Sequence, residues 1–362
     1  MLYALRSAAA AAALCTATES ARGSRTWSTI IIVLFGLAIP TMIRKFLCII
    51  APFLRGTTST ECVSSVATQH RSTMVERFRL EGLPGKFNDV ILKAHNNLEN
   101  VSQLKQVVVF FGGDTQDFPE AMELHRDNRR YAKWNLEYMA DLMFQHFPQS
   151  HCIVIRANRL QFRTFSCYDN FVESSDIGAP THEFSVAALE HLQKLIASLA
   201  AEIEKRTSPR RHVLSASLLQ PPLVLVGFSK GAVVLNQFLY SFKALEHTPD
   251  DDLSAFVSRV ANMVWLDGGH SGGSNTWVTK EVILKCLLQL DIKVDIHVTP
   301  YQIRCASRPW IGKEEKLFYD TLKRLGVDVR RTVHYDDATP CIELHFQLLE
   351  DFMPLSPQPP QS

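Results

Sequence analysis

The chain has no excess of charge of either sign, because 38 Lys and Arg residues stand against 37 Asp and Glu residues and leave a net charge of +1. Nucleic-acid binding usually requires a basic surface, so the composition argues against a nucleic-acid partner. The 13 histidines include no HExxH motif and no other paired ligand spacing. We therefore predict that the protein uses neither a metal nor an organic cofactor.

Paired cysteines are also missing. The eight cysteines are scattered without a CxxC pair, and several lie in apolar runs where a buried thiol behaves as a small hydrophobe. This pattern predicts a reducing compartment and no zinc cluster. The cysteines are Cys15, Cys48, Cys62, Cys152, Cys167, Cys286, Cys305 and Cys341.

The N-terminal residues have a composition of their own. Residues 1–25 are rich in Ala, Ser and Arg and contain a single acidic residue, Glu19, which is typical of a transit peptide. The apolar segment 28–43 is interrupted by Pro40 and is slightly shorter than the ~20 residues of a membrane helix. We predict a targeting leader over residues 1–60, with organelle import favoured. A secretory signal or a membrane association through residues 28–43 is the alternative.

The rest of the chain alternates between short apolar strands and amphipathic helices, which predicts one α/β domain over residues 75–353 with a mostly parallel sheet covered on both faces. Residues 354–362 are rich in Pro, Gln and Ser and are predicted to be a disordered tail. The predicted strands are Val107–Phe111, Cys152–Arg156, Leu223–Val226, Met263–Leu266, Lys293–Val298 and Val329–Tyr335. The predicted helices are Ala187–Glu204, Ala232–Phe242, Lys313–Leu325 and Ile342–Phe352, and Arg206–Gln220 is predicted to be a polar linker.

The sequence Gly227-Phe228-Ser229-Lys230-Gly231 lies between an apolar strand and an apolar helix. This is the context of a nucleophile elbow, in which small residues two positions before and after the serine allow backbones to approach closely. The motif predicts an α/β-hydrolase-like fold with Ser229 as the nucleophile and the Lys230 N–H as an oxyanion donor. The alternative is a strand-to-helix turn in which Gly and Ser only cap the helix.

The other parts of an acyl-transfer site follow in the expected chain order. Gly112-Gly113-Asp114 comes directly after a central strand, so the backbone N–H of Gly113 or Asp114 is the predicted second oxyanion donor, unless this is a simple glycine turn. His345 opens the last helix, where this fold places its general base. An exposed helical histidine is the alternative reading.

Asp267, at the end of the strand that follows the elbow helix, is the predicted acid that orients His345. The loop Thr299–Pro309, after the next strand, contains no carboxylate, which removes the more usual position and leaves Glu314 as the rival. A plain turn residue before two glycines is the other interpretation of Asp267.

Two further stretches compete for a role. Gly269–Gly273 is a second formal GxSxG around Ser271, but no helix follows it closely enough to make an elbow, so it is predicted to be an active-site or surface loop. His270 is a weaker candidate for the general base. Residues 166–171 follow a strand and either border the pocket or only pack.

Several runs closely resemble a little-characterised vertebrate family whose human member is named only for an open reading frame on chromosome 2. They are FSCYDNFV (165–172), GAP (178–180), GFSKG with VVLNQ (227–237), WLDGGHSGGSNTWVT (265–279), HVTPYQ (297–302) and WIGKE (310–314). The resemblance spans roughly residues 105–350. It implies an α/β-hydrolase-like fold, a mitochondrial location with the matrix favoured, and a serine hydrolase activity without an established substrate.

Two hypotheses about function follow. The first is a serine hydrolase that acts on an ester, thioester or amide in a small-molecule acyl substrate, lipid-like substrates included. In this hypothesis the Lys230 cation favours an acidic or lipid-phosphate substrate. The second is a catalytically inactive member of the fold that binds or scaffolds a metabolic enzyme, a hypothesis that the weak assignment of the acid keeps open. A lumenal or secreted esterase is a third, less favoured reading.

Overall fold

The structure is a computed structural model that describes residues 73–95, 98–176, 178–205 and 209–354. The chain divides into two units, Met1–Glu61 and Cys62–Ser362, and every described residue belongs to the second. The predicted leader over 1–60, its apolar segment 28–43 and residues 355–362 of the predicted tail lie outside the described residues. Within the described ranges, no helix combines the length and the apolar character that spanning a bilayer requires.

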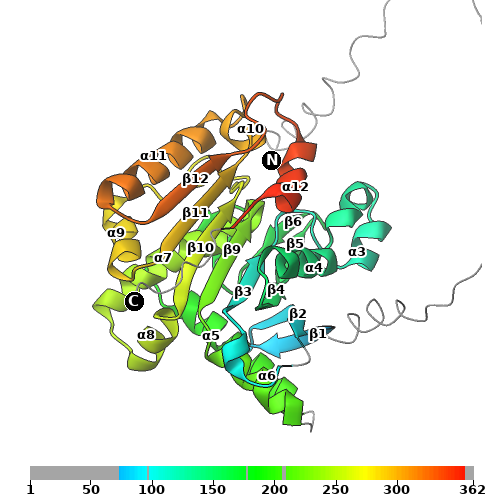
Figure 1. The fold of residues 1–362 in the computed structure, drawn as a ribbon. Coiled ribbons are helices and arrows are strands. Elements are labelled where there is room, and N and C mark those ends of the chain that lie inside the picture. Colours follow the sequence, from blue (N-terminus) through cyan, green and yellow to red (C-terminus); the bar gives the residue numbers. More distant parts are fainter. Residues whose placement is uncertain (1–72, 96–97, 177, 206–208, 355–362) are drawn as a thin grey trace, which may run out of the picture. The chain divides into compact units, whose positions relative to one another are not determined.

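An eight-stranded sheet organises the domain (Figure 1). Its order is β1 (Thr73–Glu81), β2 (Phe87–His95), β4 (Ser150–Ile155), β3 (Gln106–Phe111), β9 (Leu223–Phe228), β10 (Val260–Leu266), β11 (Lys293–Val298) and β12 (Val329–Val333). Only β2 runs against its neighbours, since it pairs antiparallel with both β1 and β4, and all other pairs are parallel. The mostly parallel sheet that the sequence predicted is therefore confirmed.

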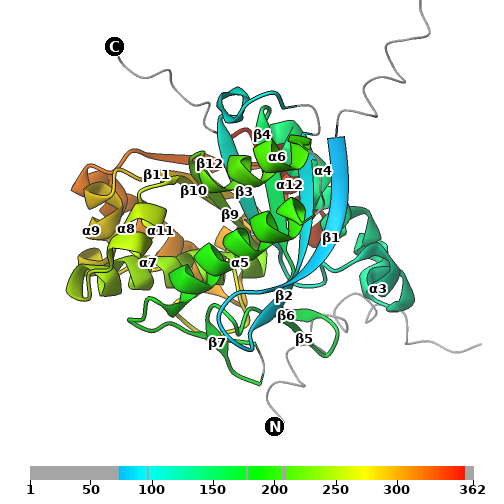
Figure 2. The same ribbon diagram turned by 90° about the horizontal axis from the view of Figure 1, so that it is seen from below.

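Helices cover both faces of the sheet (Figures 1 and 2). One face packs against α4 (Leu136–His146) and α12 (Ile342–Asp351). The other face packs against α5 (Ala187–Glu204), α6 (Pro209–Leu219), α7 (Ala232–His247), α8 (Asp251–Val257), α9 (Glu281–Gln289) and α11 (Pro309–Leu325). The connections contain α3 (Pro119–Leu124), α10 (Pro300–Ile303), the 3-10 turns Val101–Gln103, Asn128–Trp134 and Ser229–Gly231, and the ribbons β5 (Arg159–Gln161) with β6 (Phe165–Cys167) and β7 (Glu173–Ser174) with β8 (Pro180–Thr181).

The central strands divide their side chains between two cores. In β3, Val107, Val109 and Phe111 lie in the larger core, whereas Val108 and Phe110 lie in the smaller one beneath α4 and α12. Successive residues of a strand point to opposite faces, so a strand covered on both sides must be apolar throughout. This explains why the run VVVFF has no polar alternation, and why such runs identified the central strands.

The carboxyl ends of the parallel strands meet at one edge of the sheet. In the register of β3, β9 and β10, Phe111 is paired with Gly227, and Phe228 is paired with Leu266. The residues that follow these strands therefore emerge side by side, and they include Ser229 and Asp267. Ligands of open α/β sheets bind at this edge.

Two parts of the fold differ from the sequence prediction. The β1–β2 hairpin was not predicted, and residues 209–219 of the predicted polar linker form helix α6 instead. The linker prediction was wrong because Leu214 and Leu218 are buried and give an otherwise polar segment one apolar stripe. Tertiary burial thus outweighs the polar average composition of this segment.

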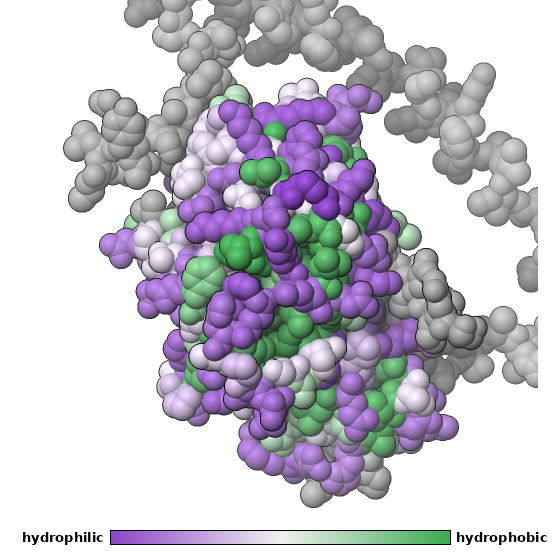
Figure 3. All heavy atoms as spheres, turned by 90° about the vertical axis from the view of Figure 1, so that its left-hand side faces the viewer, coloured by the Kyte–Doolittle hydropathy of each residue, from purple (hydrophilic) through white to green (hydrophobic). Residues whose placement is uncertain are grey.

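Apolar side chains also reach the surface. On the face that carries α8, α9 and α11, apolar patches interrupt the polar surface (Figure 3). Exposed apolar residues on α9, on the turn after it and on α11 are Val282, Leu288, Leu290 and Leu317. They belong to a different part of the domain from the strand ends that carry Ser229 and Asp267.

Candidate active site

Ser229 occupies the turn between β9 and α7. Its φ of +50° places it in the left-handed region, which is strained for any residue with a side chain. Neither the 3-10 turn Ser229–Gly231 nor α7 has a side-chain cap, so the interpretation of Ser229 as a helix cap is wrong. A sharp strained turn directly after a buried strand is the geometry of a nucleophile elbow.

The two glycines of the motif are required by close backbone contacts. A Cβ on Gly231 would lie 2.0 Å from the carbonyl oxygen of Phe111, and a Cβ on Gly227 would lie 2.9 Å from the Cα of Ala232. Both contacts are shorter than any real Cβ contact. The elbow therefore folds tightly onto itself and onto the end of β3.

Asp267 and His345 lie in contact, although 78 positions separate them in the sequence. His345 Nδ1 is 2.7 Å from Asp267 Oδ2, and both residues are buried. Asp267 also accepts hydrogen bonds from the N–H of Thr299 at 2.8 Å and from its hydroxyl at 2.6 Å. His345 is thus not an exposed helical histidine, and Asp267 is not a plain turn residue. The carboxylate is held on three sides and faces Nδ1 of the imidazole.

Aromatic rings position the imidazole of His345. The ring of Phe228, the residue before Ser229, stacks on it at 4.5 Å between centroids, and the ring of Tyr301, in the short helix α10, lies at 4.8 Å. No hydrogen bond joins the hydroxyl of Ser229 to His345 among the contacts of the described residues. In enzymes without bound substrate, the hydrogen bonds between catalytic side chains are often long and shorten only when substrate binds. The structure therefore brings Asp267 and His345 together and places Ser229 next to the residue that stacks on His345.

Gly113 does not match its predicted role. Its N–H donates to Oε1 of Gln116 at 2.8 Å and is therefore not free to bind an oxyanion in this structure. The alternative that the sequence left open, the N–H of Asp114, has no acceptor among the described residues, and the same is true of the Lys230 N–H at the elbow. Gly113 instead serves packing, since a Cβ there would lie 2.8 Å from the Cβ of Ser229.

Residues 166–168 hold this loop in place, a role that the sequence did not reveal. Ser166 donates its hydroxyl to the carbonyl of Gly113 at 2.8 Å, and Tyr168 donates its phenol to the carbonyl of Gly112 at 2.9 Å. The N–H of Ser166 donates to Oδ1 of Asp114 at 2.8 Å. Three bonds from one short segment thus fix the loop after β3, so Tyr168 does more than pack.

The prediction of an acidic substrate requires the Lys230 charge to be accessible. The structure does not show this. The side chain of Lys230 is fully buried, and its ammonium donates to the carbonyl of Gly178. Burial lowers the pKa of Lys230, an effect that the carboxylate of Asp114 opposes. Conversely, burial raises the pKa of Asp114, and the charge of Lys230 opposes that rise. Each group thus opposes the pKa shift that burial causes in the other.

Glu314, the rival acid, lies outside the Asp267–His345 pair. Its carboxylate accepts from the N–H groups of Asn275, Thr276 and Trp277 at 2.7–3.2 Å and so clamps the loop after β10. His270 is committed to the same loop, since its ring contacts the carbonyl of Asn275 and the N–H of Gly272. The structure thus joins neither Glu314 nor His270 to Ser229.

Removing this clamp should loosen the loop. In a Glu314→Ala variant, we expect amide hydrogen exchange at residues 275–277 to be about 10- to 100-fold faster, because three N–H groups lose a charged acceptor. Hydrogen–deuterium exchange followed by mass spectrometry measures this, with the exposed neighbour Lys313→Ala as the control. Equal exchange in both variants would show that the loop is held by other contacts.

No cluster in the described part of the chain resembles a metal centre, since no group of three or more His, Cys, Asp or Glu side chains converges there. The cysteines within the described ranges, from Cys152 to Cys341, are all free thiols, and Cys15, Cys48 and Cys62 lie outside those ranges.

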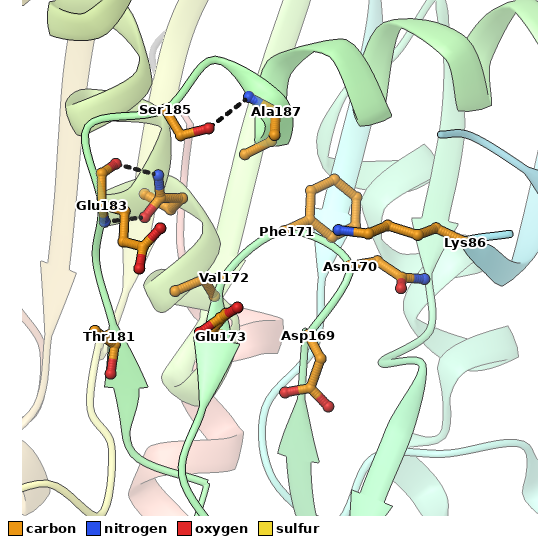
Figure 4. Close-up of a pocket in the computed structure, with 12 residues that line it drawn as sticks. Lys86, Asp169, Asn170, Phe171, Val172, Glu173, Thr181, Glu183, Ser185 and Ala187 are labelled. Atoms are coloured by element: carbon orange, nitrogen blue, oxygen red, sulfur yellow. Dashed lines mark hydrogen bonds between the residues drawn. The ribbon is translucent and has the colours of Figure 1, made fainter. Parts of the chain in front are cut away.

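A cavity of about 210 Å³ opens near the β1–β2 turn (Figure 4). It is lined by Lys86, residues 169–173, Thr181, Glu183, Ser185, Ala187, Ala188 and Gln237. The side chain of Gln237 pairs with the backbone of Glu183 on its wall. Ser229, Asp267 and His345 are not among its lining residues. We therefore do not place a substrate of the serine there.

The fold and the turn at Ser229 together define the class of protein. Three features define an α/β-hydrolase-like protein: a mostly parallel sheet with helices on both faces, a strained serine between strand and helix, and a buried pair of Asp267, after a later strand, and His345, in the last helix. The predicted fold class is thereby confirmed.

The chain belongs to the C2orf69 family, whose model matches residues 77–216 and 206–328. Its relatives include the mouse mitochondrial protein C2orf69 homolog, 37% identical over 74% of this chain and 84% of that protein, and the human mitochondrial protein C2orf69, 38% identical over 68% and 74%. A zebrafish homolog is 37% identical over 76% and 85%. The resemblance predicted from the motifs is confirmed, and so is the mitochondrial location, which these names share.

Solved structures with similar folds include esterases at low identity. The brefeldin A esterase, a bacterial homologue of human hormone-sensitive lipase, is 12% identical over 77% of this chain and 72% of its own, with a TM-score of 0.40. The thermophilic esterase Est2 of Thermogutta terrifontis is 10% identical over 76% and 88%, with a TM-score of 0.41.

Proposed function

We propose that the protein is a mitochondrial serine hydrolase, which acts in the matrix on a small-molecule ester, thioester or amide through an acyl-enzyme on Ser229. The observation that carries this proposal is the buried hydrogen bond between Asp267 and His345 beside an elbow serine at positive φ. A buried carboxylate at Asp267 and a strained backbone at Ser229 both lower the stability of the fold. Features of this kind gather at functional sites.

The reaction would proceed in two halves. The Ser229 oxygen attacks the acyl carbonyl while Nε2 of His345 takes its proton, and the carbonyl oxygen becomes an oxyanion near the N–H groups of Lys230 and Asp114. The C–X bond then breaks, and the leaving group takes the proton from His345. In the second half, water attacks the acyl-serine ester, His345 again carries the proton, and the carboxylic acid leaves. Asp267 holds the proton of Nδ1 and stabilises the imidazolium throughout.

Covalent labelling tests the proposal. We expect a fluorophosphonate probe to label the purified protein on the peptide that contains Ser229, and Ser229→Ala and His345→Ala to lose the label by at least about 10³-fold in rate. Ser271→Ala, in the second GxSxG sequence, should be labelled as the wild type is. Circular dichroism would confirm that each variant is folded.

The second candidate function is a non-catalytic scaffold for a metabolic enzyme, and one observation favours it. The hydrogen bond of the Gly113 N–H to Gln116 occupies a donor that an oxyanion would otherwise use. A Gln116→Ala variant that gains labelling when the wild type shows none would mean that this side chain blocks the site. If the folded wild type and Gln116→Ala both resist every probe, the scaffold is the better proposal.

A further inference from the structure

Arg308 lies close to the candidate active site. It ends the loop that follows β11 and precedes α11, and its guanidinium carbon is 5.8 Å from the ring of Tyr301. Tyr301 in turn contacts the ring of His345 at 4.8 Å between centroids. The guanidinium is therefore separated from the general base by a single aromatic ring.

The charge of Arg308 acts across the same edge of the sheet. Burial raises the pKa of Asp114, and the charges of Lys230, His345 and Arg308 all oppose this rise. Burial also lowers the pKa of His270, and Arg308 adds to that decrease. Asp114 follows β3 and His270 follows β10, so the charge of Arg308 acts on loops from both sides of the elbow strand.

No carboxylate neutralises this guanidinium within the described part of the chain. Asp267 is bound to Thr299 and His345, and Glu314 is bound to the three N–H groups of the clamped loop. Arg304, four residues earlier in the same loop, differs because it pairs with Asp336. Arg308 is only partly exposed, so its charge is less screened than that of a fully solvated arginine.

We propose that Arg308 binds an anionic group, a carboxylate or a phosphate, on the substrate whose scissile carbonyl lies at Ser229. This inference rests on the proposed function and gives it a substrate class, an acyl ester or thioester with a negative charge. Arg308 suits the task, because a guanidinium offers two parallel donors to a carboxylate or phosphate. It also directly precedes α11 as its N-cap residue, and the dipole of this helix adds positive potential at that point. Arg308 thus takes the place that the sequence assigned to Lys230.

The direct test is binding to a protein that cannot turn over substrate. In the Ser229→Ala background, calorimetric titration would compare monoethyl adipate, the ethyl ester of ω-phosphonohexanoate and the neutral diethyl adipate. We expect at least one anionic ester to bind more tightly than the neutral ester. Adding Arg308→Ala should weaken that binding about 10- to 100-fold and leave the neutral ester within about 3-fold. Whichever of the two anionic esters binds more tightly identifies the group as a carboxylate or a phosphate.

Two further variants make the test specific. Arg304→Ala removes an equal charge from the same loop and should change the affinity for the anionic esters by less than about 3-fold. Arg308→Lys keeps the charge but loses the paired donors, so we expect an intermediate affinity. Equal losses of affinity for the anionic esters in Arg304→Ala and Arg308→Ala would mean that only the net charge of the loop matters. This result would overturn the proposal.

Failure of this inference and failure of the proposed function give different results. Affinities that do not depend on Arg308, or anionic esters that fail to bind at millimolar concentration, overturn the anion site even if Ser229 reacts with fluorophosphonates. Conversely, Arg308-dependent binding by a protein whose Ser229 never reacts would retain the anion site and reject the hydrolase.

Discussion

Replacing Asp267 by Asn is expected to lower kcat for ester hydrolysis about 10⁴-fold while the protein remains folded. The reason lies in the hydrogen bonds around the carboxylate. The Thr299 N–H donates to Oδ1, so an amide at this position must direct its oxygen there, and its NH₂ group then faces His345.

An NH₂ group facing Nδ1 selects the wrong imidazole tautomer. Nδ1 of His345 must then accept, the ring proton moves to Nε2, and Nε2 can no longer take the proton of Ser229. The Thr299 hydroxyl tolerates either partner, because it can donate or accept. The loss is therefore catalytic rather than structural, and it should appear in kcat more than in KM.

Steady-state kinetics with a 4-nitrophenyl ester measures this loss, and urea unfolding reports the stability of the same preparation. Asp336→Asn, at an exposed aspartate paired with Arg304, is the matched control and should keep kcat within about 2-fold. Near-normal kcat in Asp267→Asn, with Ser229 still essential, would remove Asp267 from the mechanism and reopen the choice of acid.

The parts of the site that the sequence predicted well are those that depend on local pattern and chain order. The run from Leu223 to Val234 specifies a strand, a tight turn and a helix within twelve consecutive residues, so the position of Ser229 could be read directly. Asp267 was chosen because it ends the next strand, and parallel strands end at one edge. The structure places it against His345, and the catalytic roles of all three residues stay predictions.

The parts that failed depend on side chains from distant segments. Nothing near Gly113 indicates that Gln116 would bond to its N–H, and nothing near Lys230 indicates that Gly178 would bury its ammonium. Arg308 was overlooked because its importance comes from Tyr301 and His345, which are neighbours only in the folded chain. Sequence patterns predict backbone, whereas the competition for each donor and charge is decided by tertiary packing.

Gly231 lies where the elbow meets the end of β3, and Gly231→Ala is expected to destabilise the fold more than any substitution of Ser229, Asp267 or His345. The added methyl group would lie 2.0 Å from the carbonyl oxygen of Phe111 and 2.9 Å from that of Gly112. These neighbours are backbone atoms of a central strand and its loop, which cannot rotate away as a side chain could. Either β3 or α7 must move, and both belong to the main core.

We expect Gly231→Ala to lower the free energy of unfolding by more than about 3 kcal/mol, as overpacking against fixed backbone does. Urea denaturation of the purified protein measures this, and Gly273→Ala is the control, because no atom lies within 4 Å of a Cβ there. That control should stay within about 0.5 kcal/mol. A decrease in the free energy of unfolding below about 1 kcal/mol in Gly231→Ala would mean that β3 and the elbow can move apart at little cost in stability. The proposed oxyanion donors, the N–H groups of Asp114 and Lys230, lie on either side of this contact, so the separation would also move them apart.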